Sequence, residues 1–490
     1  MRMLGSRWWL LAGALALGPL AAGCSEDTGQ QSDDVTDIAN TDVKNQSIGN
    51  CWIYASVGWV ESLRLTHAGE ALNLSESYIT YWHWFEQIRD GAPGQRALAD
   101  LETKDDGTVE LNTGGWWATA VEIMRRYGML EEGVFIPEEA EDARSARQRS
   151  AQSAINTALS TGDLSTPEAR ADAAKVREVL NNAWQLSPDV VSLLDEVFGA
   201  GVERTLYDGP TIPPDSGLKT VWSLPVGHDG AGTELSLADA IGEPYWGYWG
   251  LTSREGYYAW NEESYRTWSE TSKRQFQIRV QEAMHRRLPA IMTWYVDFNA
   301  LENDNTFRTV PETPGRQGGH MTVVEDYQIT NVPGHGTLLA GVTVTDPEIL
   351  EAALSPEATI EFFRIKNSWG ESLSPDPEQG DALKGYYDLW MTYLDADIPK
   401  KDEEGTAQGL SGVVLPPDTF FSGGGEPEEP PPPDPVTGCA HELCVTGEAL
   451  DPGCDPCVAT IAAEDPFCVE NSWDDVCVGE VTSICGQTCE

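Results

Sequence analysis

The chain is poor in basic residues, in histidine and, over most of its length, in cysteine. It has 31 lysines and arginines against 79 aspartates and glutamates, a formal net charge of −48. Such a field repels phosphate backbones and anionic headgroups, so we expect no nucleic-acid partner. The acidic residues form no D-x-[DN]-x-[DN]-G loop. We therefore interpret the acidity as a source of solubility rather than as a calcium site.

A long apolar run is also missing. Residues 8–20 are apolar, but the run is too short and too early for a spanning helix, and it follows two arginines, as in an export signal. The small residues before Cys24 resemble a bacterial lipobox, which implies lipidation of Cys24 and a membrane anchor. An ordinary cleaved signal peptide with secretion is the alternative. We expect a signal peptide over residues 1–23, a flexible polar tether over 24–42, and a lipoprotein at the outer membrane, at the cell surface or in the periplasm.

The ten cysteines are distributed unevenly. Cys24 belongs to the lipobox-like segment, and eight more lie between Cys439 and Cys489. Cys51 is thus alone in the main part of the chain. Exported proteins normally pair their cysteines, so a single thiol indicates either a small buried apolar residue or a residue kept for chemistry.

The residues around Cys51 predict a helix that begins at the cysteine. Gly49 permits a tight turn, and Ile53, Val57 and Val60 recur at helical spacing. The free N–H groups and the positive end of a helix stabilise a thiolate and also provide donors for an oxyanion. This setting favours Cys51 as a nucleophile.

A thiol nucleophile needs an imidazole base, and the chain has seven histidines. His335 lies in a Pro-Gly-His-Gly turn and His441 in the cysteine-rich tail, while His67 and His83 are expected at the surface. His320 follows two glycines and opens a strand-like apolar run, which makes it the candidate base.

The segment FFRIKNSWG over residues 362–370 reads as a strand and the turn after it. With a period of two, Phe363, Ile365 and Asn367 share one face. An amide at the end of an apolar face is costly to bury without a hydrogen bond, so Asn367 needs a partner.

These segments together resemble the papain-like cysteine peptidase superfamily. The Gln, Gly and Cys-Trp residues of the first segment and the Asn-Ser-Trp-Gly string of the second occur in the family's order, with the histidine between them. In the family the glutamine usually stands six residues before the cysteine, whereas here the interval is five. The resemblance implies one role for each of five residues: Cys51 as nucleophile, His320 as base, Asn367 as the group that orients the base, Gln46 as oxyanion donor, and Trp369 as the shield of the His–Asn bond beside the substrate.

The long interval between nucleophile and base, and two further segments, look like the bleomycin hydrolase and aminopeptidase C branch. The segments are LSESY at 74–78 and NTGGW at 112–116. Paired glycines let a substrate backbone approach and bond like an added strand, so Gly114 and Gly115 are candidate substrate-binding residues. A helix-starting turn is the alternative reading.

We therefore predict an α+β, papain-like fold of two lobes. A helical lobe holds the central cysteine helix, and a β-barrel-like lobe holds the histidine and asparagine. Two helices, over 171–186 and 188–198, are expected in an insertion rich in Ala, Glu, Arg and Leu. The predicted domains are a peptidase domain over 43–415 with an insertion over 140–270, a Pro/Gly/Glu linker over 416–437, and a cysteine-rich module over 438–490.

The tail carries eight cysteines: Cys439, Cys444, Cys454, Cys457, Cys468, Cys477, Cys485 and Cys489. The C-x-x-C spacing within them leaves zinc open, but an oxidising environment and an even number favour four disulfides of unknown pairing. The tail resembles a cysteine-rich repeat of exported myxobacterial proteins.

The resulting hypothesis is a cysteine peptidase that hydrolyses peptide or protein substrates without a metal or an organic cofactor. A catalytically silent surface lipoprotein that binds peptides is one alternative. A cysteine-dependent transpeptidase or amidase is another.

Overall fold

The computed structural model describes most of the chain between residues 38 and 489. The described ranges are 38–90, 96–140, 144–247, 250–265, 272–371, 384–422, and 439–489 with gaps at 442, 451, 453, 466 and 486–488. The predicted signal peptide, the lipidation site Cys24 and most of the linker lie outside these residues. Helices and strands are mixed, as the α+β prediction requires. Within the described ranges, no helix has both the length and the apolar character needed to cross a bilayer.

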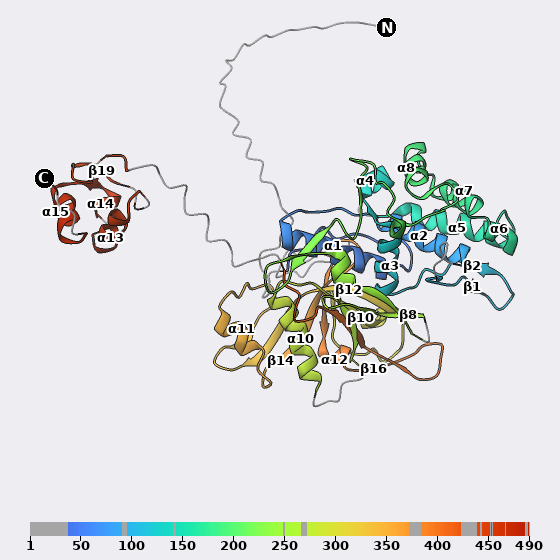
Figure 1. Ribbon diagram of the computed structural model, residues 1–490. Coiled ribbons are helices and arrows are strands. Elements are labelled where there is room, and N and C mark those ends of the chain that lie inside the picture. The colour runs from blue at the N-terminus through green and yellow to red at the C-terminus, as the bar shows by residue number, and fades with distance from the viewer. Residues whose placement is uncertain are drawn as a thin grey trace, which may run out of the picture.

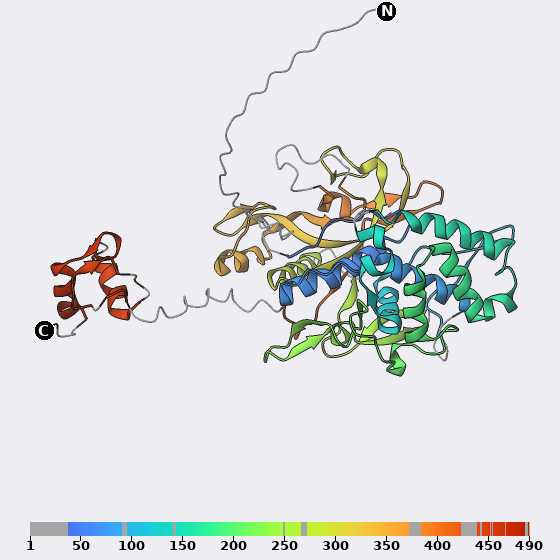
Figure 2. The same ribbon diagram turned by 90° about the horizontal axis from the view of Figure 1, so that it is seen from above.

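The cysteine helix α1 (Cys51–Ala68) begins where the sequence predicts it. Ile53, Val57 and Val60 are completely buried, as their helical spacing requires. The helix ends at Gly69, which has a left-handed φ of 65° and returns its N–H to the carbonyl of Leu65. Figures 1 and 2 show α1 between the other N-terminal helices and the sheet.

The helices beside α1 include the predicted insertion. They are α2 (Glu76–Arg89), α3 (Trp117–Tyr127), α4 (Glu132–Phe135), α5 (Ala146–Ser160), α6 (Pro167–Ala171), α7 (Ala173–Trp184) and α8 (Pro188–Phe198). The bounds of α8 match the prediction, and α7 falls inside the predicted 171–186. Ser187 caps α8 by accepting a hydrogen bond from the Val190 N–H, and Pro188 occupies the first turn, where its missing N–H costs nothing.

One mixed sheet of eight strands carries the other predicted site residues. Seven strands follow the order β11 (Thr306–Phe307), β15 (Tyr386–Trp390), β14 (Thr359–Lys366), β12 (Gln317–Val332), β10 (Ala290–Asp297), β18 (Leu410–Leu415) and β9 (Asn261–Ser264). The eighth, β13 (Gly336–Leu338), pairs with β12. Because β12 and β14 are antiparallel neighbours, with Val323 opposite Lys366, the start of β12 and the end of β14 lie side by side.

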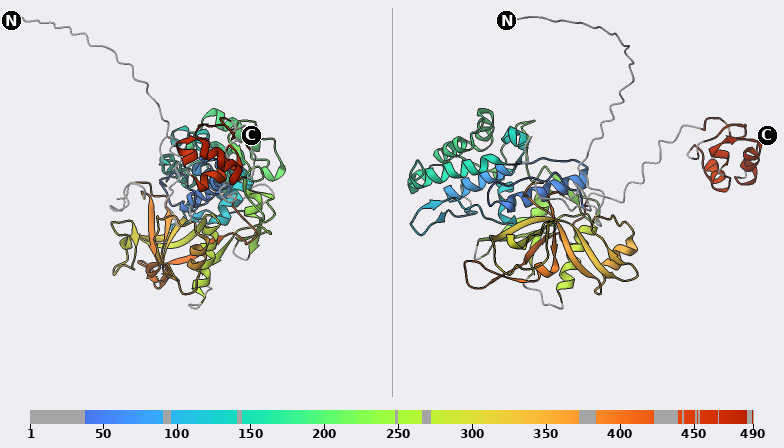
Figure 3. Two further views of the ribbon diagram at one scale, coloured as in Figure 1. Left: turned by 90° about the vertical axis from the view of Figure 1, so that its left-hand side faces the viewer. Right: turned by 180° about the vertical axis from the view of Figure 1, so that it is seen from behind.

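Short elements complete the main body. The strands are β1 (Glu102–Thr103), β2 (Val109–Glu110), β3 (Met129–Leu130), β4 (Leu218–Lys219), β5 (Pro225–His228), β6 (Glu234–Ser236), β7 (Glu243–Gly247), β8 (Gly250–Glu255), β16 (Asp397–Pro399) and β17 (Thr406–Gln408). The helices are α9 (Leu237–Ile241), α10 (Lys273–His285), α11 (Pro347–Ala353), α12 (Met391–Leu394), η1 (Pro137–Ala140), η2 (Leu206–Asp208) and η4 (Phe298–Ala300). Figure 3 shows the helices and the sheet on two sides of α1.

Aromatic side chains fill the helical part of the core. Trp82 lies flat on Tyr127 with ring centroids 3.9 Å apart, and the Arg177 guanidinium lies 5.5 Å from the Trp82 ring. The predicted surface position of His83 is wrong, because its side chain is 1% exposed and meets the edge of Trp52 at 4.8 Å. Helix α2 is buried on nearly every side, so it has no polar face on which His83 could reach water.

The cysteine-rich tail forms a module with its own core. It contains α13 (Pro456–Glu464), α14 (Phe467–Glu470), α15 (Asp475–Ser483), β19 (Gly447–Glu448) and β20 (Ser472–Trp473) around the buried ring of Trp473. The predicted four disulfides are present, and their pairing is Cys439–Cys454, Cys444–Cys489, Cys457–Cys485 and Cys468–Cys477. Small modules of this size need such cross-links because their apolar cores are limited.

Candidate active site

His320 and Asn367 meet at the edge shared by β12 and β14. His320 lies inside β12, opposite Trp294 of β10. The strand begins three residues earlier and includes both glycines, so His320 does not open it. Asn367 directly follows β14, buried on the same face as Phe363 and Ile365. The Nε2–H of His320 donates to Oδ1 of Asn367 at 2.8 Å. This bond selects one imidazole tautomer and leaves Nδ1 as the basic nitrogen.

Trp369 covers this hydrogen bond. Its ring lies nearly parallel to the His320 ring, 4.8 Å away with an angle of 20° between the planes. Trp294 packs edge-to-face with the His320 ring, with ring centroids 5.5 Å apart. Burial lowers the pKa of His320 to about 4, and the bond to Asn367 opposes that shift only in part. The imidazole is therefore neutral, and able to accept a proton, at neutral pH.

Cys51 occupies the first position of α1, next to β12. The residue is 9% exposed, and it is the one free cysteine among the described residues. Burial raises the pKa of the Cys51 thiol to about 11, against hydrogen bonds from the backbone of Met321, Trp52 and Cys51 itself. Met321, whose backbone opposes this rise in the pKa, follows His320 on β12, the strand against which α1 packs.

Gln46 links the loop before α1 to the segment after Asn367. Its N–H donates to the Ser368 carbonyl at 2.8 Å, and its side-chain Oε1 accepts from the Ser368 hydroxyl at 2.5 Å. The amide nitrogen Nε2 donates to the Ile48 carbonyl at 2.7 Å. One of its two hydrogens is thereby used within the loop, and the second remains for another acceptor.

Gly114 and Gly115 lie exposed beside the cysteine helix. A Cβ at Gly115 would meet the Trp52 ring at 2.5 Å, so only glycine fits this close approach. The Trp52 indole N–H donates to the Thr113 carbonyl at 2.8 Å, which holds the glycine segment against α1. The next residue, Trp116, is 60% exposed. On β12, Gly319 has open space beside it, because an added Cβ there would meet no atom within 4 Å.

The predicted site residues thus fall into two groups. Cys51, Gln46 and the paired glycines cluster around the start of α1, and the other group, His320, Asn367 and Trp369, lies at the sheet edge. The hydrogen bonds of Gln46 with Ser368 and the packing of α1 against β12 join the two groups. The tail cysteines form the separate module. One possible metal-ligand group in the described residues, Asp465, Cys468 and Glu480, is occupied in part by the Cys468–Cys477 disulfide.

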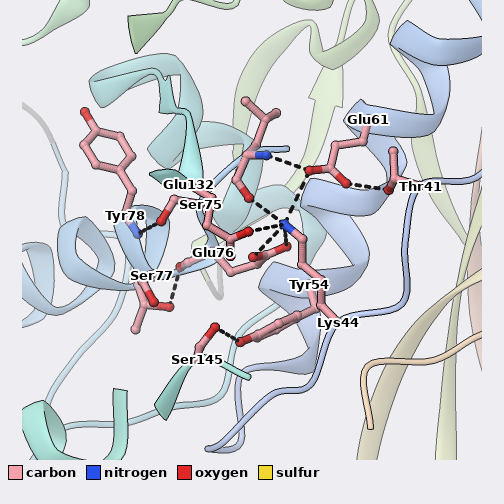
Figure 4. Close-up of polar contacts among 12 residues, drawn as sticks. Thr41, Lys44, Tyr54, Glu61, Ser75, Glu76, Ser77, Tyr78, Glu132 and Ser145 are labelled. Atoms are coloured by element: carbon pink, nitrogen blue, oxygen red, sulfur yellow. Dashed lines mark hydrogen bonds and ion pairs between the residues drawn. The ribbon is translucent and has the colours of Figure 1, made fainter. Parts of the chain in front are cut away.

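A buried charge cluster behind the site escaped prediction. Lys44 Nζ lies 3.0 Å from Glu76, 3.5 Å from Glu61 and 3.7 Å from Glu132, and it donates to the Leu74 carbonyl at 2.8 Å. Figure 4 shows Lys44 at the centre of these groups. Its signal in the sequence was a glutamate, Glu61, one turn after the buried Val57 in an apolar helix.

Charge and burial compete within this cluster. Burial alone would lower the pKa of Lys44, but the three carboxylates outweigh it and hold that pKa above its usual value. Burial raises the pKa of Glu76 to about 8 and that of Glu132 to about 7, despite the nearby Lys44. Burial also lowers the pKa of Lys366, the residue before Asn367, to about 8.

The cluster is tied to both groups of the site. The Lys44 carbonyl accepts from the Gly370 N–H at 3.1 Å, so Lys44 holds the strand-like segment that carries Gln46 against the Asn-Ser-Trp-Gly string. On the sheet side, Lys366 donates to the Thr41 hydroxyl at 3.0 Å, and Thr41 donates to Glu61 at 2.6 Å.

Helix α5 of the insertion braces the same loop. Ser47 donates its hydroxyl to the Ser145 carbonyl at 2.7 Å, and Asn50 donates to Gln148 at 3.1 Å. Arg149 donates from Nε and Nη2 to the Ser47 carbonyl, at 3.2 and 2.7 Å. The sequence gives no periodic signal for these contacts.

Comparisons with known proteins match two parts of the chain. Residues 437–489 match the family described as Domain of unknown function (DUF8252). No curated protein matches the sequence. Among solved structures, PepW from Lactobacillus rhamnosis is 13% identical, with a TM-score of 0.33, over 78% of this chain and 81% of that one.

Two other solved structures are similar at the same level. The bromelain protease from Ananas comosus is 13% identical over 78% of this chain and 96% of its own, with a TM-score of 0.27. Xylellain, a cysteine protease from Xylella fastidiosa, is 11% identical over 76% of this chain and 82% of its own, with a TM-score of 0.25.

Proposed function

We propose that this chain is a cysteine peptidase that hydrolyses peptide bonds through Cys51, His320 and Asn367, within a two-lobed papain-like fold. The observation that carries the proposal is the 2.8 Å hydrogen bond from His320 to Asn367 beneath Trp369, on a strand that packs against the helix that begins at Cys51. A nucleophile, a base and a group that orients the base are the three parts that acyl transfer by a thiol requires.

The reaction proceeds in two acyl transfers. The Cys51 sulfur attacks the amide carbonyl while Nδ1 of His320 takes the thiol proton, and the carbonyl oxygen becomes an oxyanion. The Cys51 N–H and the remaining amide hydrogen of Gln46 stabilise that oxyanion. His320 then gives its proton to the leaving amine, which departs as the C–N bond breaks. Water, deprotonated by His320, attacks the thioester and releases the acid and the free thiol.

The resting pair is neutral in this proposal. Burial raises the pKa of Cys51 to about 11 and lowers the pKa of His320 to about 4, so a thiol and an imidazole face the substrate at neutral pH. The proton therefore moves during attack rather than before it, and the reactivity of the thiol depends on His320.

Labelling with an epoxide or a vinyl sulfone tests the proposal. We expect modification of Cys51 near pH 7, detected as a mass shift on its tryptic peptide, and none in Cys51→Ala. In His320→Ala the thiol should react only as the pH approaches its own pKa of about 11. A His320→Ala variant that reacts as fast as the wild type at pH 7 would contradict the assigned base.

An unlabelled thiol in a folded protein would instead favour a silent peptide-binding protein. The use of one Gln46 amide hydrogen by the Ile48 carbonyl is the observation behind that alternative. A transpeptidase or amidase would be recognised by aminolysis products when amines are added to the digest.

For location, we propose an exported lipoprotein anchored through Cys24. The support is the lipobox-like sequence alone. Mass spectrometry of the mature N-terminus should find an acylated Cys24, and Cys24→Ser should release the protein from membranes. A mature N-terminus at another residue, without lipid, would contradict the anchor.

A further inference from the structure

Helix α5 presents a polar groove next to the loop that carries Gln46. The groove has a volume of about 480 Å³ and lies between one face of α5 and strand β2. Amide and hydroxyl side chains from α5 line it, with Arg149 at the N-terminal end. These α5 side chains are Gln152, Ser153, Asn156, Thr157 and Ser160. Such a lining offers hydrogen bonds to polar groups and little apolar surface to apolar ones.

Helix α5, which lines the groove, is hydrogen-bonded to two segments of the candidate active site. Arg149 binds the carbonyl of Ser47, in the loop between Gln46 and Cys51. Further along the same helix, Oδ1 of Asn156 accepts from the Leu111 N–H at 2.9 Å, which ties α5 to the start of the segment that leads to Gly114. A substrate held between these two segments would extend into the groove.

Arg149 retains most of its hydrogen-bonding capacity. A guanidinium has five N–H donors, and the Ser47 carbonyl takes the edge formed by Nε and Nη2. The edge formed by Nη1 and the second hydrogen of Nη2 has the geometry that matches a carboxylate. The side chain is exposed, and no carboxylate of the described residues pairs with it.

Arg149 is the one basic residue among those that line the groove, and Glu110 is the one acidic residue. Glu110 lies 3.6 Å from Lys104, which also pairs with Glu102 at 2.7 Å. The guanidinium of Arg149 is therefore the cationic group that the lining offers to an anionic side chain, in a chain whose net charge is −48.

We propose that Arg149 is a specificity residue and that the groove takes an acidic side chain, aspartate or glutamate, close to the scissile bond. This inference rests on the proposed peptidase function and names its substrate class. A glutamate would pair end-on with the guanidinium while its amide isostere, glutamine, would lose the charge-assisted bond. We expect cleavage of the glutamate peptide to be about 10- to 100-fold more efficient, the range of a hydrogen bond to a charged group.

Matched peptides that differ only in Glu, Gln or Lys at each position around the cleaved bond provide the test. The readout is the ratio of kcat/KM for Glu over Gln at the preferred position. Arg149→Gln should bring the ratio to about one, Arg149→Lys should retain part of it, and Arg149→Glu should favour Lys. Because Arg149 also braces Ser47, these variants should cleave all substrates more slowly. Loss of bracing alone, however, would leave the Glu/Gln ratio of kcat/KM unchanged.

Arg147→Gln is the control on the same helix. Its guanidinium is paired with Glu138 and with the Trp184 carbonyl, so the Glu/Gln ratio should stay at the wild-type value. A wild type that cleaves Glu and Gln peptides equally, or an Arg149→Gln variant with the wild-type ratio, would overturn the inference.

Binding to Cys51→Ala separates the inference from the proposed function. In this variant, Glu peptides should bind more tightly than Gln peptides, and the added change Arg149→Gln should remove the difference. If no peptide is cleaved and Cys51 is not labelled, but this difference persists, the groove stands and the peptidase proposal fails. Equal binding of both peptides would overturn the groove itself.

Discussion

The two sides of the candidate site are held by different kinds of structure. On the sheet side, backbone pairing of β12 with β10 and β14 places His320 and Asn367, and aromatic rings cover them. On the helix side, the loop from Lys44 to Cys51 has little regular structure. Side chains hold it instead, through the charge cluster around Lys44 and the contacts from α5.

Because of this difference, substitutions on the two sides should have different effects. Strand register is shared among many backbone bonds, so one side chain on the sheet contributes chemistry more than stability. A buried cation surrounded by carboxylates differs, because the loss of that one side chain leaves several buried charges without a partner. Substitutions on the helix side should therefore cost folding energy, and those on the sheet side should cost rate.

The largest expected effect is the loss of the Lys44 charge. Lys44→Met leaves three acidic side chains near one another without their cation, and removal of one partner from a buried ionic group costs about 3–5 kcal/mol. The free energy of unfolding, measured with urea at pH 7, should fall by that amount. Labelling of Cys51 should slow as well, because the loop loses its anchor.

Lys219→Met is the matched control. Its ammonium lies 3.0 Å from Glu131, but both side chains are more than a third exposed, so the pair contributes about 0–1 kcal/mol. Equal losses in the two variants would show that the buried cluster has no special role on the helix side.

On the sheet side, we expect Asn367→Ala to slow peptide hydrolysis about 100-fold, near the lower limit of what a positioned acid–base group supplies. The substitution removes the acceptor of the His320 Nε2–H and frees the ring to change its tautomer. The urea midpoint should move far less than in Lys44→Met. Gln328→Ala removes an amide that links the same two strands, through Glu361 at 2.8 Å, and should leave kcat/KM unchanged. A normal rate in Asn367→Ala would remove this residue from the mechanism.

Local sequence patterns were sufficient to predict the site residues that lie on helices and strands. The helical spacing after Gly49 predicted the start of α1 at Cys51, and the period of two along β14 predicted that Asn367 shares the buried face with Ile365. In both segments, a buried face repeats with the period of the backbone. Such a pattern can be read without any knowledge of the partner element.

Contacts between distant segments have no such period, and these were the ones missed. Lys44 meets Glu132 and Arg149 meets Ser47 across long stretches of sequence, because insertion helices fold back on the loop. The disulfide pairing in the tail could not be predicted from the sequence for the same reason. His83 was misplaced because its helix is enclosed by aromatic neighbours contributed by other segments, such as Trp52.

The smallest expected effect is on the pH dependence of stability, where the buried carboxylates and the buried histidines have opposite signs. Burial raises the pKa of Glu76 to about 8 and of Glu132 to about 7, so the folded state binds these protons more tightly than the unfolded chain. Their stabilising contribution is present at low pH and is lost as the pH rises towards 8. Burial lowers the pKa of His320 and His285 to about 4 and of His83 to about 3, so stability is lost as the pH falls below about 6.5.

The free energy of unfolding should therefore be greatest near pH 6.5. It should fall by about 1–2 kcal/mol between pH 6.5 and 8, since one pKa unit corresponds to about 1.4 kcal/mol. Glu76→Gln keeps the shape of the side chain without its proton and should remove most of this alkaline fall, while the acid limb set by the histidines remains. Glu70→Gln, at a half-exposed carboxylate paired with Arg64, should keep both limbs. An alkaline fall that survives in Glu76→Gln would mean that the charge cluster does not set the pH response of the helix side.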